Sequence, residues 1–321
     1  MTSDLAIDAS GLVKSYGAVR VLAGIDLRVR RGTVFGLLGA NGAGKTTTVR
    51  ILSTLARADS GRARVAGFDV VSDQAQVRRR ISLTGQDAAV DELQTGDENL
   101  RMMGRLSGLS RSQARVRAAA LLERFGLVDA GPRRVATYSG GMRRRLDLAA
   151  CVVAQPAVIF LDEPTTGLDP RSRHAMWELI AELVESGVTV FLTTQYLEEA
   201  DRLADSVAVI DGGRVVAEGS PAELKQRVTS ERLDLTLADA WAFDQVARSL
   251  GERALRADAS RLTLGVATDG SASQIRGLLD EIDPERRAVS SFAVHAATLE
   301  DVFLDLTDAT ATSRERESAR V

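Results

Sequence analysis

The stretch from Gly39 to Thr47 constrains the fold of this chain more than any other part of it. It reads Gly-Ala-Asn-Gly-Ala-Gly-Lys-Thr-Thr and fits the phosphate-binding pattern G-x-x-x-x-G-K-[ST]. The apolar run 34–38 before it is typical of a buried strand, and residues 47–55 after it can form a helix. A strand, a glycine-rich loop and a helix in this order predict an α/β fold of the P-loop NTPase type.

Small residues in such a loop let successive backbone N–H groups converge on phosphate oxygens at a helix N-terminus. We expect Lys45 to reach the β- and γ-phosphates and the Thr46 hydroxyl to hold Mg²⁺. Only three of the 41 basic residues are Lys, so a compact ammonium at position 45 stands out in an Arg-rich chain. The alternative is a glycine-rich turn without a ligand. The predicted phosphate-binding residues are Gly39, Asn41, Gly42, Ala43, Gly44, Lys45, Thr46 and Thr47.

A pair of carboxylates follows a second apolar run. Residues 158–161 read Val-Ile-Phe-Leu, which is typical of a central parallel strand buried on both faces, and Asp162 and Glu163 come directly after it. Open α/β sheets bind ligands at this end of their strands. Adjacent buried carboxylates are costly unless a cation or a reaction uses them. We therefore assign Asp162 to Mg²⁺ and Glu163 to the attacking water.

Four further segments carry candidate ligand-binding residues. Tyr16 lies in a turn-like stretch where its ring can stack on adenine, or can be an ordinary tyrosine at a strand end. Gln86 ends a predicted strand that begins at residue 81, and Gln195 follows the apolar strand 188–192. Ser139 is a predicted N-cap, and Gly140 and Gly141 after it make that helix start a second potential anion site.

The rest of the chain predicts several subdomains. Alternating apolarity at 5–8 and 19–30 indicates antiparallel strands, and capping boxes at Thr95 and Ser110 begin two helices. A hairpin with an Asp-Gly turn is expected within 207–216. We predict a nucleotide-binding domain over 1–225 with a helical subdomain at about 87–140, an α+β domain with βαββαβ order over 226–307 and a disordered tail over 308–321.

Bulk properties exclude some classes of function. The net charge of −3 gives no reason to propose nucleic acid as a partner, and no window approaches the roughly 18 apolar residues of a membrane-spanning helix. The single cysteine, Cys151, suits a reducing cytosol and lies in an apolar helical run, so we interpret it as a core residue. His174 and His295 have no partner at ligand spacing, so we expect packing or solvated roles rather than metal binding.

These motifs, in this order, closely resemble the nucleotide-binding subunits of ABC transporters over about residues 4–220. The resemblance implies ATP and Mg²⁺ as cofactors, Tyr16 as the adenine-stacking ring, Gln86 as the Q-loop residue near the metal and Lys45, Glu163 and Gln195 as the catalytic group. It also implies that Ser139, Gly140 and Gly141 form the signature and that Asp169 lies in the D-loop. In this family two such domains pair head to tail and dock on a membrane-spanning permease, at the cytoplasmic face of the cell membrane.

Two departures narrow the resemblance. The signature begins with Tyr138 and ends in Met142, and Gln195 stands where a histidine is usual. Both features are similar to daunorubicin and doxorubicin resistance ATP-binding subunits, which also share the appended C-terminal domain and an ending like residues 297–306. The resemblance therefore implies an ATPase that drives drug export. The alternatives are export of another cargo, such as a lipid or polysaccharide, and a soluble ABC ATPase acting on ribosomes or DNA.

Overall fold

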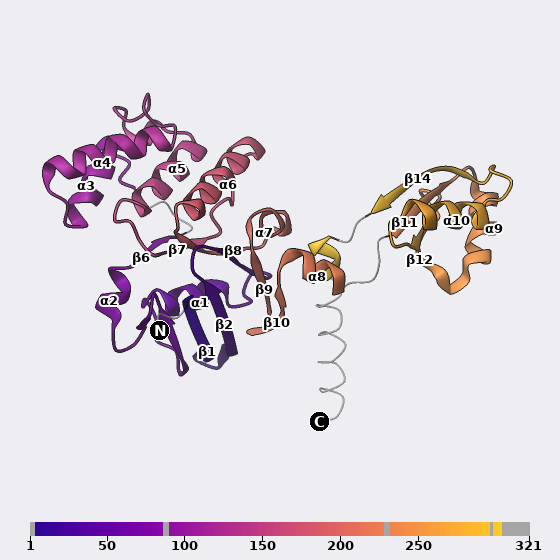
Figure 1. Ribbon diagram of the computed structural model, residues 1–321, viewed down its shortest axis with the longest axis horizontal. Coiled ribbons are helices and arrows are strands. Elements are labelled where there is room, and N and C mark those ends of the chain that lie inside the picture. Colours follow the sequence, from indigo (N-terminus) through magenta and orange to yellow (C-terminus); the bar gives the residue numbers. More distant parts are fainter. Residues whose placement is uncertain (1–3, 86–89, 228–231, 296–297, 304–321) are drawn as a thin grey trace. The chain divides into compact units, whose positions relative to one another are not determined.

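The computed structural model describes residues 4–85, 90–227, 232–295 and 298–303 of the chain. These residues form two compact units, Met1–Pro221 and Ala222–Val321. Each unit has its own β-structure and its own hydrophobic core. The two units appear in Figure 1.

A six-stranded sheet is the centre of the first unit, with strand order β10-β9-β3-β8-β7-β6. Its strands run parallel from β9 to β6, and β10 pairs antiparallel with β9 at the edge. Strands β3, β7 and β8 are buried along their whole length, as their continuous apolar sequences predict. The strands are β3 (Val34–Leu38), β6 (Ile81–Thr84), β7 (Val158–Asp162), β8 (Thr189–Thr194), β9 (Ser206–Asp211) and β10 (Arg214–Gly219).

A four-stranded antiparallel sheet completes the β-structure of this unit, with order β2-β1-β4-β5. The prediction that the first strand ends near Asp8 was wrong, because the strand continues to Tyr16. Gly11 has φ 61° and the register with β2 shifts between Ala9 and Leu12, so a bulge resets the alternation that marked the strand. The strands are β1 (Leu5–Tyr16), β2 (Val19–Arg30), β4 (Ser60–Val65) and β5 (Phe68–Asp69).

Three helices of the first unit begin at the predicted caps, whereas α1 begins at Lys45 and not at residue 47. Both capping boxes, Thr95 with Glu98 and Ser110 with Gln113, are confirmed, and the Ser139 hydroxyl accepts a hydrogen bond from the Met142 N–H. Helix α3 packs against α4 and α5, and these helices appear together in Figure 1. The helices are α1 (Lys45–Leu52), α2 (Gln74–Arg78), α3 (Gly96–Leu106), α4 (Arg111–Arg124), η1 (Val135–Thr137), α5 (Gly140–Cys151), α6 (Pro170–Glu185) and α7 (Leu197–Leu203).

The hairpin between β9 and β10 differs from its prediction. Asp211 pairs with Arg214, so the two-residue loop is Gly212-Gly213 rather than Asp-Gly. Both glycines have positive φ, at 52° and 75°, which is the conformation that a two-residue hairpin loop requires. The pairing at Asp211 shifted the turn by one residue from the dipeptide that the sequence suggested.

The second unit contains a four-stranded antiparallel sheet of order β12-β13-β11-β14. The predicted βαββαβ order is confirmed, and the sheet and helices bury a core that includes Leu233, Leu235, Phe243 and Leu264. The elements are α8 (Pro221–Arg227), β11 (Arg232–Leu237), α9 (Ala240–Leu250), η2 (Gly251–Arg253), β12 (Ala254–Asp258), β13 (Thr263–Ala267), α10 (Ala272–Ile282) and β14 (Val289–His295).

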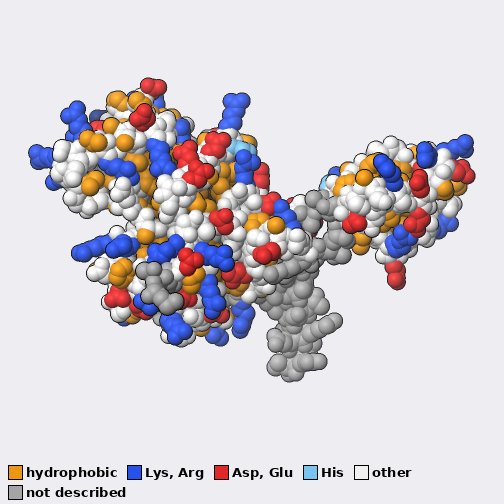
Figure 2. Space-filling view, viewed as in Figure 1, with side chains coloured by type: hydrophobic (Ala, Val, Ile, Leu, Met, Phe, Trp, Pro, Cys, Tyr) orange, Lys and Arg blue, Asp and Glu red, His pale blue; other side chains and the backbone are white. Residues whose placement is uncertain are grey.

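The end of the chain is described only in part. A helix begins at Leu299, and Leu299 and Val302 are buried. The predicted tail over 308–321 lies outside the described residues. Within the described ranges, no helix combines the length and the apolarity needed to cross a membrane. Figure 2 shows basic and acidic side chains interspersed on the visible face of the first unit.

Candidate active site

A cavity of about 650 Å³ lies where β3, β7 and β8 end. Its lining brings together residues from distant parts of the sequence, as expected at the carboxyl ends of parallel strands. The sequence predicted most of these residues but not Val21 or Thr166. The lining residues are Tyr16, Val21, Asn41, Gly42, Gly44, Lys45, Thr46, Thr47, Glu163, Thr166 and Gln195.

The glycine-rich loop has the backbone shape that its sequence predicts. Gly44 has φ 112° and immediately precedes α1, and a Cβ there would lie 2.6 Å from the Leu22 side chain. A Cβ on Gly39 would overlap the Ile210 backbone. Only glycine fits both positions, so the loop can reach the N-terminus of α1 without a steric clash. The first turn of α1 carries no acidic side chain, which leaves its N–H groups suited to an anion.

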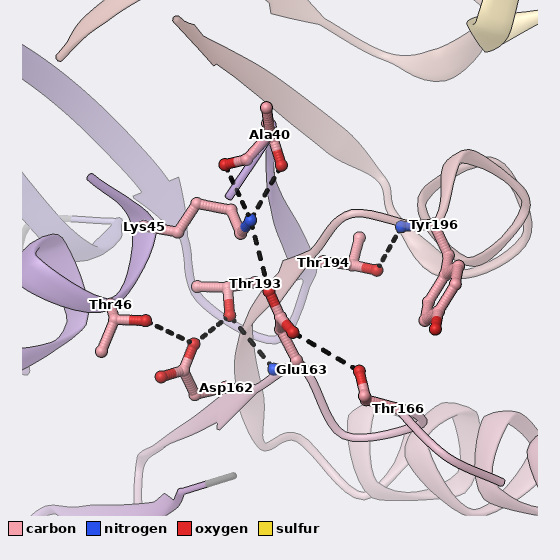
Figure 3. A network of polar contacts seen from close by, with 10 residues as sticks. Ala40, Lys45, Thr46, Asp162, Glu163, Thr166, Thr193, Thr194 and Tyr196 are labelled. Carbon is pink, nitrogen blue, oxygen red and sulfur yellow. Dashed lines mark hydrogen bonds and ion pairs between the residues drawn. The ribbon is translucent and has the colours of Figure 1, made fainter. Parts of the chain in front are cut away.

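Lys45 is the buried cation of the cavity, with only 4% of its side chain exposed. Its Nζ donates to the carbonyl oxygens of Gly39 at 2.8 Å and Ala40 at 3.2 Å, and lies 3.3 Å from Glu163 Oε1. Figure 3 shows these contacts converging on one nitrogen. Buried charges need such partners, and the same three-donor ammonium can bind phosphate oxygens.

Asp162 ends β7 and faces the start of α1. Its Oδ1 accepts hydrogen bonds from the hydroxyls of Thr193 and, at 3.4 Å, of Thr46 (Figure 3). Two oxygens this close can belong to one coordination shell of Mg²⁺, which takes few protein ligands and fills its remaining positions with water and phosphate. The described residues contain no group of three or more His, Cys, Asp or Glu suited to a metal. The donor set therefore fits a phosphate-bound Mg²⁺ rather than an all-protein metal site.

Glu163 has an unusual backbone. Its φ of 51° lies in the left-handed region, which costs a non-glycine residue about 1–3 kcal/mol and is concentrated at functional sites. Its N–H donates to the Thr193 carbonyl at 3.0 Å and to the Thr193 hydroxyl at 3.2 Å. The Thr166 hydroxyl reaches Oε2 at 3.4 Å. The surrounding structure thus holds the carboxylate in one orientation beside Lys45.

Tyr16 and Gln195 lie at the cavity wall as predicted. Tyr16 is the last residue of β1, its side chain is 48% exposed, and the Lys14 ammonium lies 5.4 Å from the ring centroid. This ring has a free area on which a flat base can stack. Gln195 does not cap the next helix, because Tyr196 is the N-cap of α7 and no side chain caps there. The other interpretation of Gln195, as a cap of the helix that follows it, is therefore wrong.

Among the described residues, the remaining predicted site residues do not line this cavity. Ser139 is the N-cap of α5 and Gly140 and Gly141 begin that helix, where a Cβ on Gly141 would overlap the Ser172 hydroxyl. Asp169 is the N-cap of α6, and hydrogen bonds from the Ser172 hydroxyl and N–H hold its pKa below the usual range. Gly39 and Ala43 belong to the glycine-rich loop but are not among the residues that line the cavity. Gln86 lies outside the described residues.

Sequence reasoning missed several residues that organise the site. Thr193 contacts both Asp162 and Glu163. The pairing of β8 with β7 places Thr193 beside Asp162, so knowledge of that pairing would have identified it. Glu199 is fully buried, and its Oε1 accepts from the Thr165 hydroxyl at 2.8 Å and the Trp177 indole at 3.1 Å. Burial raises the pKa of the Glu199 carboxyl.

Cys151, His174 and His295 were predicted from the sequence to take no part in catalysis or metal binding. Cys151 ends α5 and is buried, and burial raises the pKa of its thiol. His174 has a ring nitrogen 2.8 Å from the Pro170 carbonyl and is stacked at a tilt on Trp177. His295 lies 3.2 Å from Asp234. The packing interpretation of Cys151 is thereby confirmed.

The sequence and fold of this chain are similar to those of known proteins. A family model described as ABC transporter matches residues 22–166. The daunorubicin/doxorubicin resistance ATP-binding protein DrrA of Streptomyces peucetius is 51% identical over 317 residues, which cover 98% of this chain and 96% of that protein. The chain belongs to the ABC transporter family. As an ABC ATP-binding subunit it binds and hydrolyses ATP, and such subunits work with a membrane permease.

Two further comparisons fit this assignment. The Nod factor export ATP-binding protein I of Ralstonia nicotianae is 38% identical over 303 residues, covering 94% of this chain and 93% of that protein. A solved ATP-binding subunit of an ABC transporter superposes with a TM-score of 0.62 at 29% identity, covering 69% of this chain and 92% of that one. The predicted ABC ATPase fold and ATPase activity are confirmed.

Proposed function

We propose that this ABC ATPase energises export of an amphipathic antibiotic of the daunorubicin type through a separate membrane-spanning subunit. One observation carries the proposal: the similarity to the Streptomyces peucetius resistance protein covers 98% of this chain, the second compact unit included. A likeness confined to the ATPase core would support ATP hydrolysis and nothing finer. The chain lies at the cytoplasmic face of the membrane in this proposal, as a peripheral subunit.

The phosphates of ATP bind over the start of α1. The loop residues 39–44 present backbone N–H groups, and the Lys45 ammonium exchanges its carbonyl contacts for β- and γ-phosphate oxygens. Tyr16 stacks on the adenine, because its exposed ring lines the same cavity. Thr46 and Asp162 would hold Mg²⁺, with Gln86 as a further ligand. When bound, this ion neutralises phosphate charge that develops during the reaction.

Glu163 is the base in this mechanism. Its carboxylate lines the cavity next to Lys45, and the Thr193 contacts hold its backbone, so it can accept a proton from the attacking water. Gln195 donates a hydrogen bond to a phosphate oxygen or orients the water. A neutral amide does not titrate near neutral pH, which leaves the proton to Glu163.

Two copies of the chain complete the site. Ser139, Gly140, Gly141 and Asp169 do not line the cavity of their own chain, although a serine cap with two glycines at a helix start suits an anion. We propose that these residues contact the γ-phosphate held by a second copy in a head-to-tail homodimer. The second compact unit serves assembly of this dimer or of the complex with the membrane subunit.

A different cargo is the second candidate. The 38% identical relative is named for Nod factor export, so the same overall chain occurs in proteins with other cargoes. A lipid or polysaccharide cargo is compatible with every residue of the ATPase site, because the cargo touches the membrane subunit. A soluble ABC ATPase acting on ribosomes or DNA is the third class.

Efflux measurements in cells test the proposal. Cells that express the chain with its membrane subunit should lose preloaded daunorubicin faster than cells that express Glu163→Gln with the same subunit. If the two kinds of cell export daunorubicin equally, and the cells with the wild-type chain export a lipid faster than those with Glu163→Gln, the second candidate is favoured. Membrane fractionation with and without the membrane subunit tests the third class, since a ribosome-bound ATPase would not follow that subunit into the membrane fraction.

A further inference from the structure

The guanidinium of Arg144, in the second turn of α5, donates to three backbone carbonyls. Its Nε contacts the Pro164 oxygen at 2.7 Å, Nη2 contacts the Glu163 oxygen at 3.2 Å, and Nη1 contacts the Gly85 oxygen at 2.9 Å. Only 11% of the side chain is exposed. An Arg can make this set of bonds because its donors form a rigid planar fork, whereas a Lys has one nitrogen.

Two of the three bonded carbonyls, those of Glu163 and Pro164, lie at the strained backbone of the site. Glu163 has φ 51°, and its own carbonyl and that of Pro164 follow this left-handed turn. Thr193 holds the N–H side of Glu163, and Arg144 holds the C=O side. Strained backbone persists only where the surroundings over-determine it. Through its bond to the Gly85 carbonyl, Arg144 also contacts the segment that directly precedes Gln86.

Arg144 also belongs to the helix that begins at the signature. Ser139 is the N-cap of α5, and Arg144 lies within the same twelve-residue helix. A helix moves as a rigid element, so a shift at its start displaces the guanidinium. We propose that Arg144 is a positioning residue that holds the Glu163 backbone and couples the Ser139 end of α5 to the orientation of the Glu163 carboxylate. This inference rests on the proposed role of Glu163 as the base.

The neighbouring Arg145 is a matched control. It lies on the same helix, and its Nη1 donates to the carbonyls of Phe125 at 3.1 Å and Gly126 at 3.4 Å. Its bonds are thus of the same kind as those of Arg144, but they hold the end of α4 and not the Glu163 loop. A general effect of losing a guanidinium–carbonyl contact on α5 would appear in both variants.

Steady-state ATPase assays of the full chain test the inference. Arg144→Lys should lower kcat about 10- to 100-fold, as small misplacements of a catalytic group do, with ATP affinity within about twofold of wild type. Arg145→Lys should change kcat less than about twofold. Arg144→Gln, which keeps one amide donor, provides a second variant if Arg144→Lys melts at a lower temperature than wild type. Wild-type kcat in a folded Arg144 variant would overturn the inference.

A double-mutant cycle separates positioning from general stability. In the Glu163→Gln background, single-turnover hydrolysis should show no further loss from Arg144→Lys, because the residue acts through Glu163. The same fold loss in both backgrounds would show that Arg144 supports the structure in another way. If Glu163→Gln alone retains wild-type turnover, the proposed base is wrong. An impaired Glu163→Gln with an unimpaired Arg144→Lys contradicts only the positioning role.

Discussion

The two compact units differ in the number and the partners of their buried charged side chains. In the first unit, Lys45, Asp162, Glu163 and Glu199 are all buried, and the first three belong to one network of polar contacts (Figure 3). Among the described residues of the second unit, the buried charged side chain is Asp283, and it accepts from the backbone N–H groups of residues 287–289. The contrast indicates that the first unit gives up stability to prepare chemistry, whereas the buried carboxylate of the second unit holds its own backbone.

The largest effect is expected from Glu163→Gln, which tests the role of the buried charge in the first unit. Loss of a positioned general base typically costs about 10² to 10⁴ in rate, so turnover should fall by that factor while ATP binding is retained and a nucleotide-bound dimer accumulates. The measurements are steady-state ATPase, equilibrium nucleotide binding and gel filtration with ATP. Undiminished turnover would remove Glu163 from the mechanism and weaken the comparison.

A core substitution in the second unit tests its independence. Leu235 is fully buried between neighbouring strands, and Leu235→Ala should lower the free energy of unfolding of that unit by about 2–5 kcal/mol. ATP affinity of the full chain should not change. Leu255→Ala, at a residue that is 52% exposed, is the control. A parallel loss of ATP binding in Leu235→Ala would mean that the units do not fold separately.

Gln195→Ala probes the cavity without removing a charge. Removing one donor to a developing negative charge typically costs about 10²-fold in kcat, and ATP affinity should change little. Gln195→His should keep substantial activity, because an imidazole can also donate. Assays between about pH 6 and about pH 8 would add a titration to the histidine variant alone. Unchanged kcat in Gln195→Ala would show that the residue takes no part in the reaction.

The smallest expected effect concerns Glu199. Burial raises its pKa in the folded protein above the ordinary value of 4.5, so its contribution to stability is complete below that pH and is lost as the pH rises through the folded pKa. Glu199→Gln, which does not titrate, should therefore be more stable than wild type at about pH 8, by about 1 kcal/mol, and the difference should shrink toward pH 5. Urea unfolding measures this difference.

Glu198 provides the control for that experiment. Its side chain is 62% exposed and lies 3.4 Å from Arg173, so Glu198→Gln should alter the unfolding free energy by only a few tenths of a kcal/mol. An equal response of the two variants would show that the pH effect is not specific to the buried carboxyl.

Sequence reasoning reached the site residues whose roles follow from local pattern. The loop 39–47 and the carboxylates at the end of β7 are each contiguous in the sequence, and the residues next to them indicate which element carries them. The bracing contacts could not be predicted in this way. Arg144 meets Gly85 across 59 positions, and Thr193 meets Asp162 across 31, so both depend on packing and strand pairing. The left-handed φ of Glu163 has no signature either, because it occurs at a residue that seldom adopts it.

Cys151 makes the chain convenient for labelling. It is the only thiol in the sequence, and its burial and raised pKa keep it protonated and shielded from maleimides and other alkylating reagents. A cysteine introduced at an exposed position would therefore be modified against a low background. Two such cysteines, one in each unit, would carry a pair of spin labels or fluorophores, whose separation can be followed through a cycle of ATP hydrolysis.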